Sequence, residues 1–343
     1  MTANSELPTI SCTAKSRRRA SSRGTTLLEL LVVLALVGAL LGIGVGFAAR
    51  LNFPRQAAVE GVKGVLQAAR AFAVTQGNLA RVLASREGRS VQRLGFKTIG
   101  EWHFEGSGGE GAFGEPLDLR SAHTIEDGRL GSALAFDDGG FAEASIGSHP
   151  AWQTADGFSF GADLRPERGG GLVARRGDGW RLEVRADGSA AVELALVSTV
   201  KGEGARGEKL RVESPPDLLR PGRWTRVSFL YDRTHLRLWI DGIERARSRR
   251  ATDPVWLDGS NLRLSDPERT FRGAIDEVAV AALVVEEPLL LPEGVELAQD
   301  ADVWFDASGN LDPARHDGPL ALELQFERGA TRRIEVTAYG TLR

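Results

Sequence analysis

Seven Asp-Gly pairs between residues 127 and 259 constrain the fold of this 343-residue chain more than any other feature. Asp-Gly suits two-residue hairpin turns, because both central positions of a type I′ turn need a positive φ. Short runs that alternate polar and apolar residues lie between the pairs, and one such run places Thr225, Val227 and Phe229 on a single face. We therefore expect residues 99–283 to form an all-β sandwich with its own core.

Five pieces of this region carry a family resemblance when they are taken in order. They are residues 131–137, 158–164, 222–227, 236–242 and 271–278. Together they resemble the concanavalin A-like, laminin G-like jelly roll. The resemblance implies a domain that binds glycans or proteins, often with a calcium ion.

No metal site and no cofactor are predicted, with calcium in the sandwich as the alternative. Asp276 and Glu277 could supply oxygen ligands to calcium, but a lone acidic pair on a strand is more often structural. The single Cys excludes a multi-cysteine zinc site and an intramolecular disulfide. The five His are scattered and contain no HExxH pair. A net charge of −3 argues against a nucleic-acid partner.

Catalysis by the sandwich is not expected, and no catalytic residue is predicted. Glucanases of this fold need two carboxylates that flank the scissile bond. The nearest match to their acidic pattern, Glu183 with Asp187, runs straight into a glycine turn. Four tryptophans could stack on sugar rings if they were exposed, but core packing is the favoured interpretation. They are Trp102, Trp152, Trp180 and Trp239.

The amino-terminal part has a different character. Residues 1–24 carry a net charge of +4, and residues 30–49 form an uncharged apolar run. As a helix, this run would span about 30 Å, the thickness of a bilayer core. The positive segment in front of it predicts a single-pass inner-membrane protein with a cytoplasmic amino terminus and an extracytoplasmic remainder.

Residues 23–33, RGTTLLELLVV, resemble the processing signal of type IV pilins and type II secretion pseudopilins. The resemblance implies that a prepilin peptidase cuts after Gly24 and that Thr25 becomes the N-methylated first residue, where the family usually has Phe. Glu29 would then be the fifth mature residue, and it would pair with the terminal ammonium of a neighbouring subunit during assembly. An unpaired carboxylate inside a bilayer is costly, which gives this pairing its physical reason.

Gly38, Gly42 and Gly46 lie four residues apart on one face of the same expected helix. Such a stripe allows a second helix to approach closely in a membrane. The alternative is that these glycines only soften the helix.

Two further segments extend the resemblance. Residues 69–73, ARAFA, resemble the later helix of the GspH/FimT class of minor pseudopilins, and residues 322–326 and 333–340 alternate as strands of a closing sheet do. Four parts are thus expected. They are a leader over residues 1–24, a pilin helix over 25–78, a β head over 79–98 and 284–343, and an inserted sandwich over 99–283.

The expected fold class is α+β, with a long transmembrane pilin helix, a small antiparallel β head and an inserted all-β jelly roll. The expected function is that of a minor pseudopilin of type II secretion with a non-catalytic binding domain. The alternatives are an adhesive minor pilin of a type IV pilus with a glycan- or protein-binding head, and a pilin-anchored glycan hydrolase. The expected partners are other pilins or pseudopilins, the prepilin peptidase, the inner membrane and a secreted protein or glycan.

Overall fold

The computed structural model describes residues 27–50, 53–106, 109–147, 149–167, 170–198, 206–327 and 329–343. Within these ranges, the side chains of residues 41–50, 53 and 54 are not described. The chain forms two compact units, Met1–Phe53 and Pro54–Arg343, and each is described by itself.

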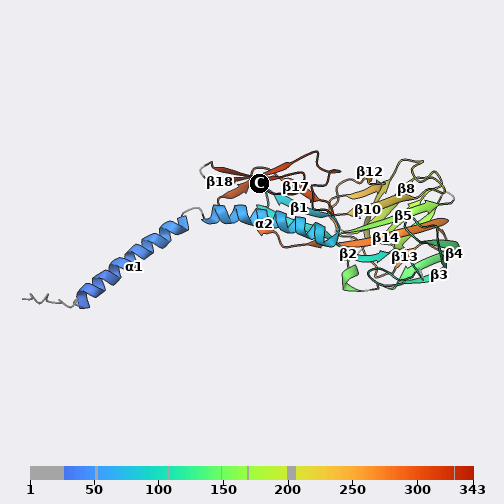
Figure 1. The fold of residues 1–343 in the computed structure, drawn as a ribbon, viewed down its shortest axis with the longest axis horizontal. Coiled ribbons are helices and arrows are strands. Elements are labelled where there is room, and N and C mark those ends of the chain that lie inside the picture. Colours follow the sequence, from blue (N-terminus) through green and yellow to red (C-terminus); the bar gives the residue numbers. More distant parts are fainter. Residues whose placement is uncertain are drawn as a thin grey trace, which may run out of the picture. The chain divides into compact units, whose positions relative to one another are not determined.

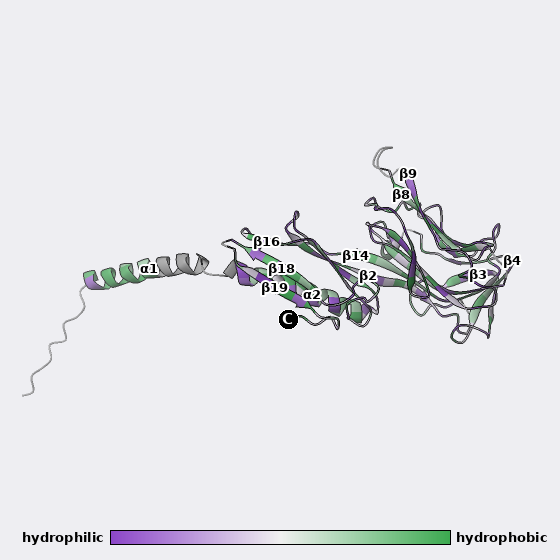
Figure 2. Ribbon diagram, turned by 90° about the horizontal axis from the view of Figure 1, so that it is seen from above, coloured by the Kyte–Doolittle hydropathy of each residue, from purple (hydrophilic) through white to green (hydrophobic). Residues whose placement is uncertain are grey.

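Helix α1 (Leu27–Arg50) belongs to the first unit. Its described side chains are apolar apart from Glu29, and its large ones are exposed, from Val37 at 45% to Leu27 at 80%. Figure 2 shows the described part of α1 almost wholly in the hydrophobic colour.

The predicted membrane span over residues 30–49 is wrong. Across the described residues, neither helix combines the length and the mean hydropathy that crossing a bilayer requires. The predicted single-pass inner-membrane localisation fails on the same finding.

The predicted α+β fold class is wrong as well, because the described residues are mainly β, with many strands and only two α-helices. A continuous pilin helix over residues 25–78 is not seen. Instead, α2 (Phe53–Gln76) is an element separate from α1 and begins with Pro54 in its first turn. Proline is tolerated in the first helical turn, where its missing N–H group would have had no partner within the helix.

Helix α2 packs on strands through one apolar stripe. Ala58, Val62, Leu66, Ala69 and Ala73 recur at helical spacing and are at most 4% exposed. They share a core with apolar residues of β1 (Ala80–Ser85), β17 (Ala301–Phe305) and β18 (Leu320–Phe326). Figure 1 shows α2 running alongside these strands, and its mixed colouring in Figure 2 reflects the two-sided pattern.

The strands under α2 form two sheets. Strand β1 pairs antiparallel with both β17 and β2, and β15 pairs with the start of β2. A separate three-stranded sheet has the order β16-β18-β19. The remaining bounds are β2 (Ser90–Trp102), β15 (Leu289–Leu290), β16 (Val295–Leu297) and β19 (Thr331–Val336).

Most of the chain forms a jelly-roll sandwich. Its strands follow the order β12-β11-β10-β5-β14-β4-β13-β6-β7-β8-β9, and β3 pairs with β4. A short 3₁₀ helix, Pro150–Trp152, lies between β4 and β5. The strands are β3 (Leu117–Ile125), β4 (Ala133–Ala144), β5 (Phe158–Pro166), β6 (Gly171–Arg176), β7 (Trp180–Val184), β8 (Ala190–Val197), β9 (Arg206–Glu213), β10 (Thr225–Tyr231), β11 (Leu236–Ile240), β12 (Ile243–Arg247), β13 (Leu262–Leu264) and β14 (Gly273–Val285).

The expected type of hairpin turn connects β11 to β12. Asp241 and Gly242 both have positive φ, at 50° and 75°, as a type I′ turn requires. Strand β10 also buries the face predicted for it, which carries Thr225, Val227 and Phe229.

The core of the sandwich is aromatic. Phe160 stacks on Phe229 with 5.7 Å between ring centroids, and Trp180 meets Phe229 edge-on at 5.4 Å. Core packing also holds for the other tryptophans that were candidates for sugar stacking, because each is at most 8% exposed. These are Trp102, Trp152 and Trp239.

Two 13-residue strands, β2 and β14, run beyond the sandwich toward the region of α2. A third apolar cluster, which includes Leu94 of β2, Leu283 of β14, Trp239 and Trp304, joins the two larger cores. The predicted domain boundaries at residues 99 and 283 fall inside these strands, and the division into domains stays a prediction.

Candidate functional site

A cleft of about 840 Å³ opens between the outer face of the sandwich and the carboxyl end of α2. Five small residues make its floor: Ser159 and Gly161 on β5, Ser228 on β10, and Ala279 and Ala281 on β14. They form one contiguous patch, because Gly161 pairs with both Ser228 and Ala279, and Ser159 pairs with Ala281.

The alternation of the strands explains this floor. Side chains on neighbouring strand positions point to opposite faces, so the large residues between the small ones, such as Phe158, Phe160 and Phe229, fill the core. The tight packing of these rings holds the strands in place. The cleft therefore has a hydroxyl-bearing floor on a rigid support.

The end of α2 supplies a polar wall. Thr75, Gln76 and Asn78 line the cleft at this wall. The Thr75 hydroxyl donates to the Ala71 carbonyl at 2.8 Å, and the Asn78 Oδ1 accepts from the backbone of Leu79 at 2.9 Å. These bonds leave the Asn78 amide nitrogen for other partners.

Arg226 lies over the Gly161 part of the floor in a fixed position, since a Cβ atom on Gly161 would stand 2.9 Å from its Nη2. Its Nη1 lies 3.0 Å from the Asp163 Oδ2 and donates to the Glu277 carbonyl oxygen at 2.7 Å. A guanidinium held in this way needs little reordering to bind a ligand, which lowers the entropic cost of binding.

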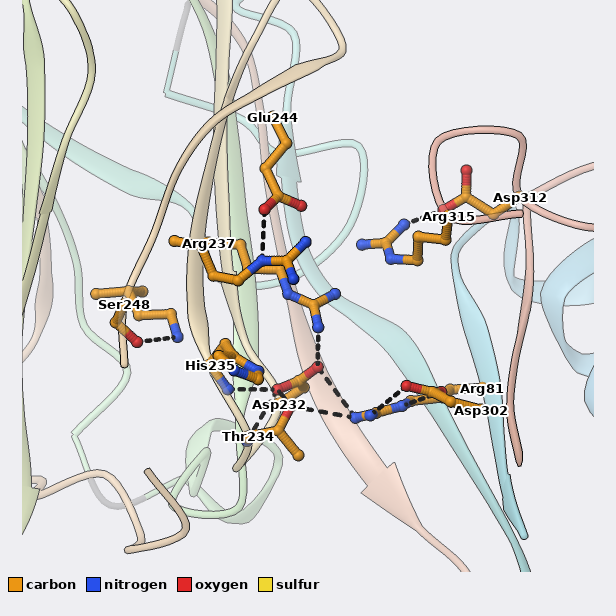
Figure 3. Close-up of polar contacts among 12 residues, drawn as sticks. Arg81, Asp232, Thr234, His235, Arg237, Glu244, Ser248, Asp302, Asp312 and Arg315 are labelled. Carbon is orange, nitrogen blue, oxygen red and sulfur yellow. Dashed lines mark hydrogen bonds and ion pairs between the residues drawn. The ribbon is translucent and has the colours of Figure 1, made fainter. Parts of the chain in front are cut away.

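Arg315 closes the opposite end of the cleft. Its guanidinium lies 4.1 Å from the Trp304 ring centroid and 5.2 Å from that of Trp239, which are favourable cation–π distances. Its Nη1 is paired with the Asp312 carboxylate (Figure 3). Burial lowers the pKa of Arg315 to about 10, so the side chain still carries its charge at neutral pH.

A buried ion-pair network lies next to this end (Figure 3). Arg81 of β1 binds the Asp302 carboxylate through two nitrogens at 2.7 and 2.8 Å, and its Nη1 lies 3.0 Å from Asp232 in the turn between β10 and β11. Asp232 also accepts from the backbone of Thr234 and His235 at 2.9 and 3.0 Å. The network thus joins the sandwich to the strands under α2.

Opposing effects set the protonation of Asp232. Burial alone would raise the pKa of this carboxyl. The charge of Arg81, the hydroxyl of Thr234 and the charge of Arg237 outweigh burial and hold the pKa below its usual value. Asp232 is therefore ionised at neutral pH.

The residues predicted from the amino-terminal motif are not among those that line this cleft. Gly24 and Thr25 lie outside the described residues. Glu29 lies in the first turn of α1, and Gly38 follows in the same helix with open space where a Cβ atom would stand. Gly42 and Gly46 also fall within α1, and the predicted roles of these residues stay predictions.

The acidic pair considered for calcium has protein partners. Asp276 accepts hydrogen bonds from the backbone of Arg129 and Leu130 at 2.7 and 3.1 Å, and the Glu277 carboxylate lies 2.9 Å from His103. Within the described ranges, no three His, Cys, Asp or Glu side chains are arranged to hold a metal ion. The prediction of no cofactor and its calcium alternative both stay predictions.

Sequence reasoning missed the cleft residues. Arg226 lies in the 222–227 piece but was not singled out as a binding residue, and Arg315 belongs to no motif. A usable signal was the run of small residues at alternate positions of β5 and β10, such as Ser159, Gly161 and Ser228. Outward positions of a solvated strand normally carry larger polar side chains.

Comparison with known families identifies the sandwich. Residues 138–287 match the family model of the concanavalin A-like lectin/glucanases superfamily, of laminin G type. The chain contains a concanavalin A-like jelly-roll domain. This confirms the resemblance of the sandwich, whereas nothing in the comparisons supports a pilin or pseudopilin part. No curated protein matches the chain.

Solved structures resemble the concanavalin A-like domain at low sequence identity. Domain 4 of an extracellular arabinanase from Geobacillus stearothermophilus, in complex with arabinotriose, is 14% identical over 55% of this chain and 93% of that one, with a TM-score of 0.38. The binding domain of a paraclostridial mosquitocidal protein is 10% identical over 54% of this chain and 48% of that one, with a TM-score of 0.42. A Trypanosoma rangeli sialidase is 15% identical over 53% of this chain and 30% of that one, with a TM-score of 0.39.

Proposed function

We propose that this protein is a non-catalytic glycan-binding protein, and that the cleft on its concanavalin A-like domain is the binding site. The observation that carries the proposal is the floor of Ser159, Gly161, Ser228, Ala279 and Ala281 between polar walls. Small side chains leave room for a pyranose ring, and the hydroxyl and amide groups around them can exchange hydrogen bonds with sugar hydroxyls.

The topology favours a glycan over an extended peptide. Strands β5, β10 and β14 each pair on both sides, so their backbone groups are already bonded and cannot add a peptide strand.

The carboxylates of the domain do not favour hydrolysis. Glycoside cleavage uses two acidic groups about 5–10 Å apart. Among the described residues that line the cleft, the carboxylates are those of Asp312 and Glu101. Asp312 is paired with Arg315, and the Glu101 carboxylate lies 3.6 Å from His103. Glu183, part of the nearest acidic pattern in the sequence, lies within 4 Å of three arginines. They are Arg185, Arg211 and Arg269.

Filling the cleft tests the proposal. On the full chain, Ala279→Trp places an indole on the floor, and we expect it to abolish the glycan binding that the wild type shows on a glycan array. Leu130→Trp is the matched control, because Leu130 is 65% exposed and does not line the cleft. Wild-type chain that binds no glycan, or Ala279→Trp that folds and binds as the wild type does, would overturn the proposal.

A second candidate function is that of a pseudopilus subunit that carries this binding domain, with an adhesive minor pilin as its close variant. The observation that favours it is α1. The helix presents Leu, Val and Ala around its described surface and has a single acidic residue, Glu29, in its first turn. An exposed apolar surface of this kind marks an interaction site, and similar helices of other subunits would cover it. Its partners would be other pilins or pseudopilins and the prepilin peptidase.

A further inference from the structure

The arginine end of the cleft has hydrogen-bonding capacity that the protein itself does not use. The Arg315 side chain is 10% exposed and lines the cleft, and its Nε and Nη2 atoms are buried without a hydrogen-bond partner. Buried donors are nearly always paired, and an unpaired charged donor is especially costly. A buried guanidinium that keeps two nitrogens without acceptors, although its Nη1 is paired with Asp312, therefore indicates a missing acceptor.

A second buried guanidinium lies near the first. The Arg237 side chain is 7% exposed, its Nε also lacks a partner, and its Nη2 lies 3.9 Å from the Asp232 carboxylate. Figure 3 shows the Arg315 guanidinium turned toward Arg237. Burial lowers the pKa of Arg315, and the charge of Arg237 lowers it further. Two like charges at close range repel each other, and an anion beside them would relieve the repulsion.

We propose that the Arg315 end of the cleft binds the carboxylate of an acidic sugar, so that the ligand is a uronate-bearing glycan. This inference rests on the proposed glycan-binding function and narrows it. The planar guanidinium fork matches the planar carboxylate and can donate two parallel hydrogen bonds to it. The neutral part of the sugar lies over the floor that holds Ser159 and Ser228.

The position of Arg315 explains why sequence patterns do not reveal this site. Its guanidinium is held over Trp304, a residue of β17, and over Trp239, a residue of β11. The stacking orients the group at the end of the cleft before any ligand arrives, which reduces the ordering cost of binding.

Isothermal titration calorimetry on the full chain tests the inference with three probes: trigalacturonate, its trimethyl ester, and a tri-glutamate peptide. We expect the acid to bind about 10- to 100-fold more tightly than the ester, as the loss of a charged hydrogen-bond pair predicts. Arg315→Gln should remove this preference, so that acid and ester bind the variant with the same affinity. Arg272→Gln, an exposed arginine paired with Asp138, is the control and should keep the preference.

Each result has a defined meaning. Equal binding of acid and ester overturns the inference and leaves the glycan-binding function standing. Preferential binding of the glutamate peptide overturns the choice of a sugar. Binding of neither saccharide overturns the inference, and the glycan array then decides the proposed function separately. The comparison of acid with ester uses wild-type chain, so it does not depend on whether Arg315→Gln folds.

Discussion

Arg81 shows how a single residue can hold two parts of a fold together. Its side chain is 5% exposed, and the Asp232 side chain that it contacts is fully buried. Its guanidinium also lies 4.8 Å from the Trp304 ring centroid. Removing Arg81 takes away the closest charged partner of Asp232 and leaves only the more distant Arg237 at 3.9 Å. Breaking a buried pair in this way costs far more than the pair itself contributes.

We expect Arg81→Met to lower the free energy of unfolding by about 3–5 kcal/mol at pH 7. The pKa of Asp232 is lower in the folded than in the unfolded state. Its contribution to stability is therefore complete above the unfolded pKa, about 3.9, and disappears as the pH falls through the folded pKa. The difference between wild type and Arg81→Met should accordingly shrink below about pH 4.

Urea denaturation at a series of pH values measures this difference. Arg120→Met is the matched control, because its pair with Asp118 is exposed at 64% and 58%, and such pairs add little to stability. A loss for Arg81→Met that is no larger than for the control, or that stays constant down to pH 2, would show that Asp232 does not depend on Arg81.

Helix α2 depends on tertiary packing rather than on its own helical tendency. It contains Gly61 and Gly64, which weaken a helix by about 1 kcal/mol each relative to alanine. The Leu66 side chain, in contrast, is fully buried against the strands. Burial of one face against a sheet is the usual source of stability for a helix of this kind.

We therefore expect Leu66→Ala to destabilise the fold by about 2–5 kcal/mol, because it removes buried methyl groups and leaves a cavity. Gln67→Ala changes the next position, which is exposed, and should stay within about 0.5 kcal/mol of the wild type. Thermal and urea unfolding of both variants measure the effect. A loss for Leu66→Ala as small as that for Gln67→Ala would mean that α2 does not pack on the sheet in solution.

At the scale of the whole molecule, the Pro54–Arg343 unit has two large cores and a smaller cluster between them. Strand β2 contributes to all three, with Val91 in one large core, Phe96 in the small cluster and Trp102 in the other large core. The concanavalin A-like domain is thus continuous with the strands under α2, and the cleft lies where they meet.

The second candidate function makes a prediction about the entire chain. If the protein assembles as a pseudopilin, the mature polypeptide begins at Thr25 with one added methyl group. Glu29→Leu should then leave the processing intact and prevent co-purification with other pilins. Intact mass spectrometry of protein from its native host checks the first point. A retained leader, or normal co-purification of Glu29→Leu, would rule out this function.

What the sequence determined by itself was local. The Asp241-Gly242 turn and the alternation along β10 depend on neighbouring residues only, and the ordered pieces that resemble a concanavalin A-like domain were enough to identify it. The same local reasoning failed for the amino-terminal helix. An apolar run and a processing motif indicated an α+β pilin in a membrane, and the strand content and the described helices contradict that fold and location.

Only the tertiary structure decided where a ligand can bind. The cleft brings Asn78, Ser159, Ser228, Ala279 and Arg315 to one place, and sequence periodicity carries no information on such distant contacts. Arg120 and Arg272 form exposed pairs, whereas Arg315 is buried because folding places two indole rings around it. Burial and missing partners turn an ordinary charged residue into a candidate binding group, and both properties arise only once the chain has folded.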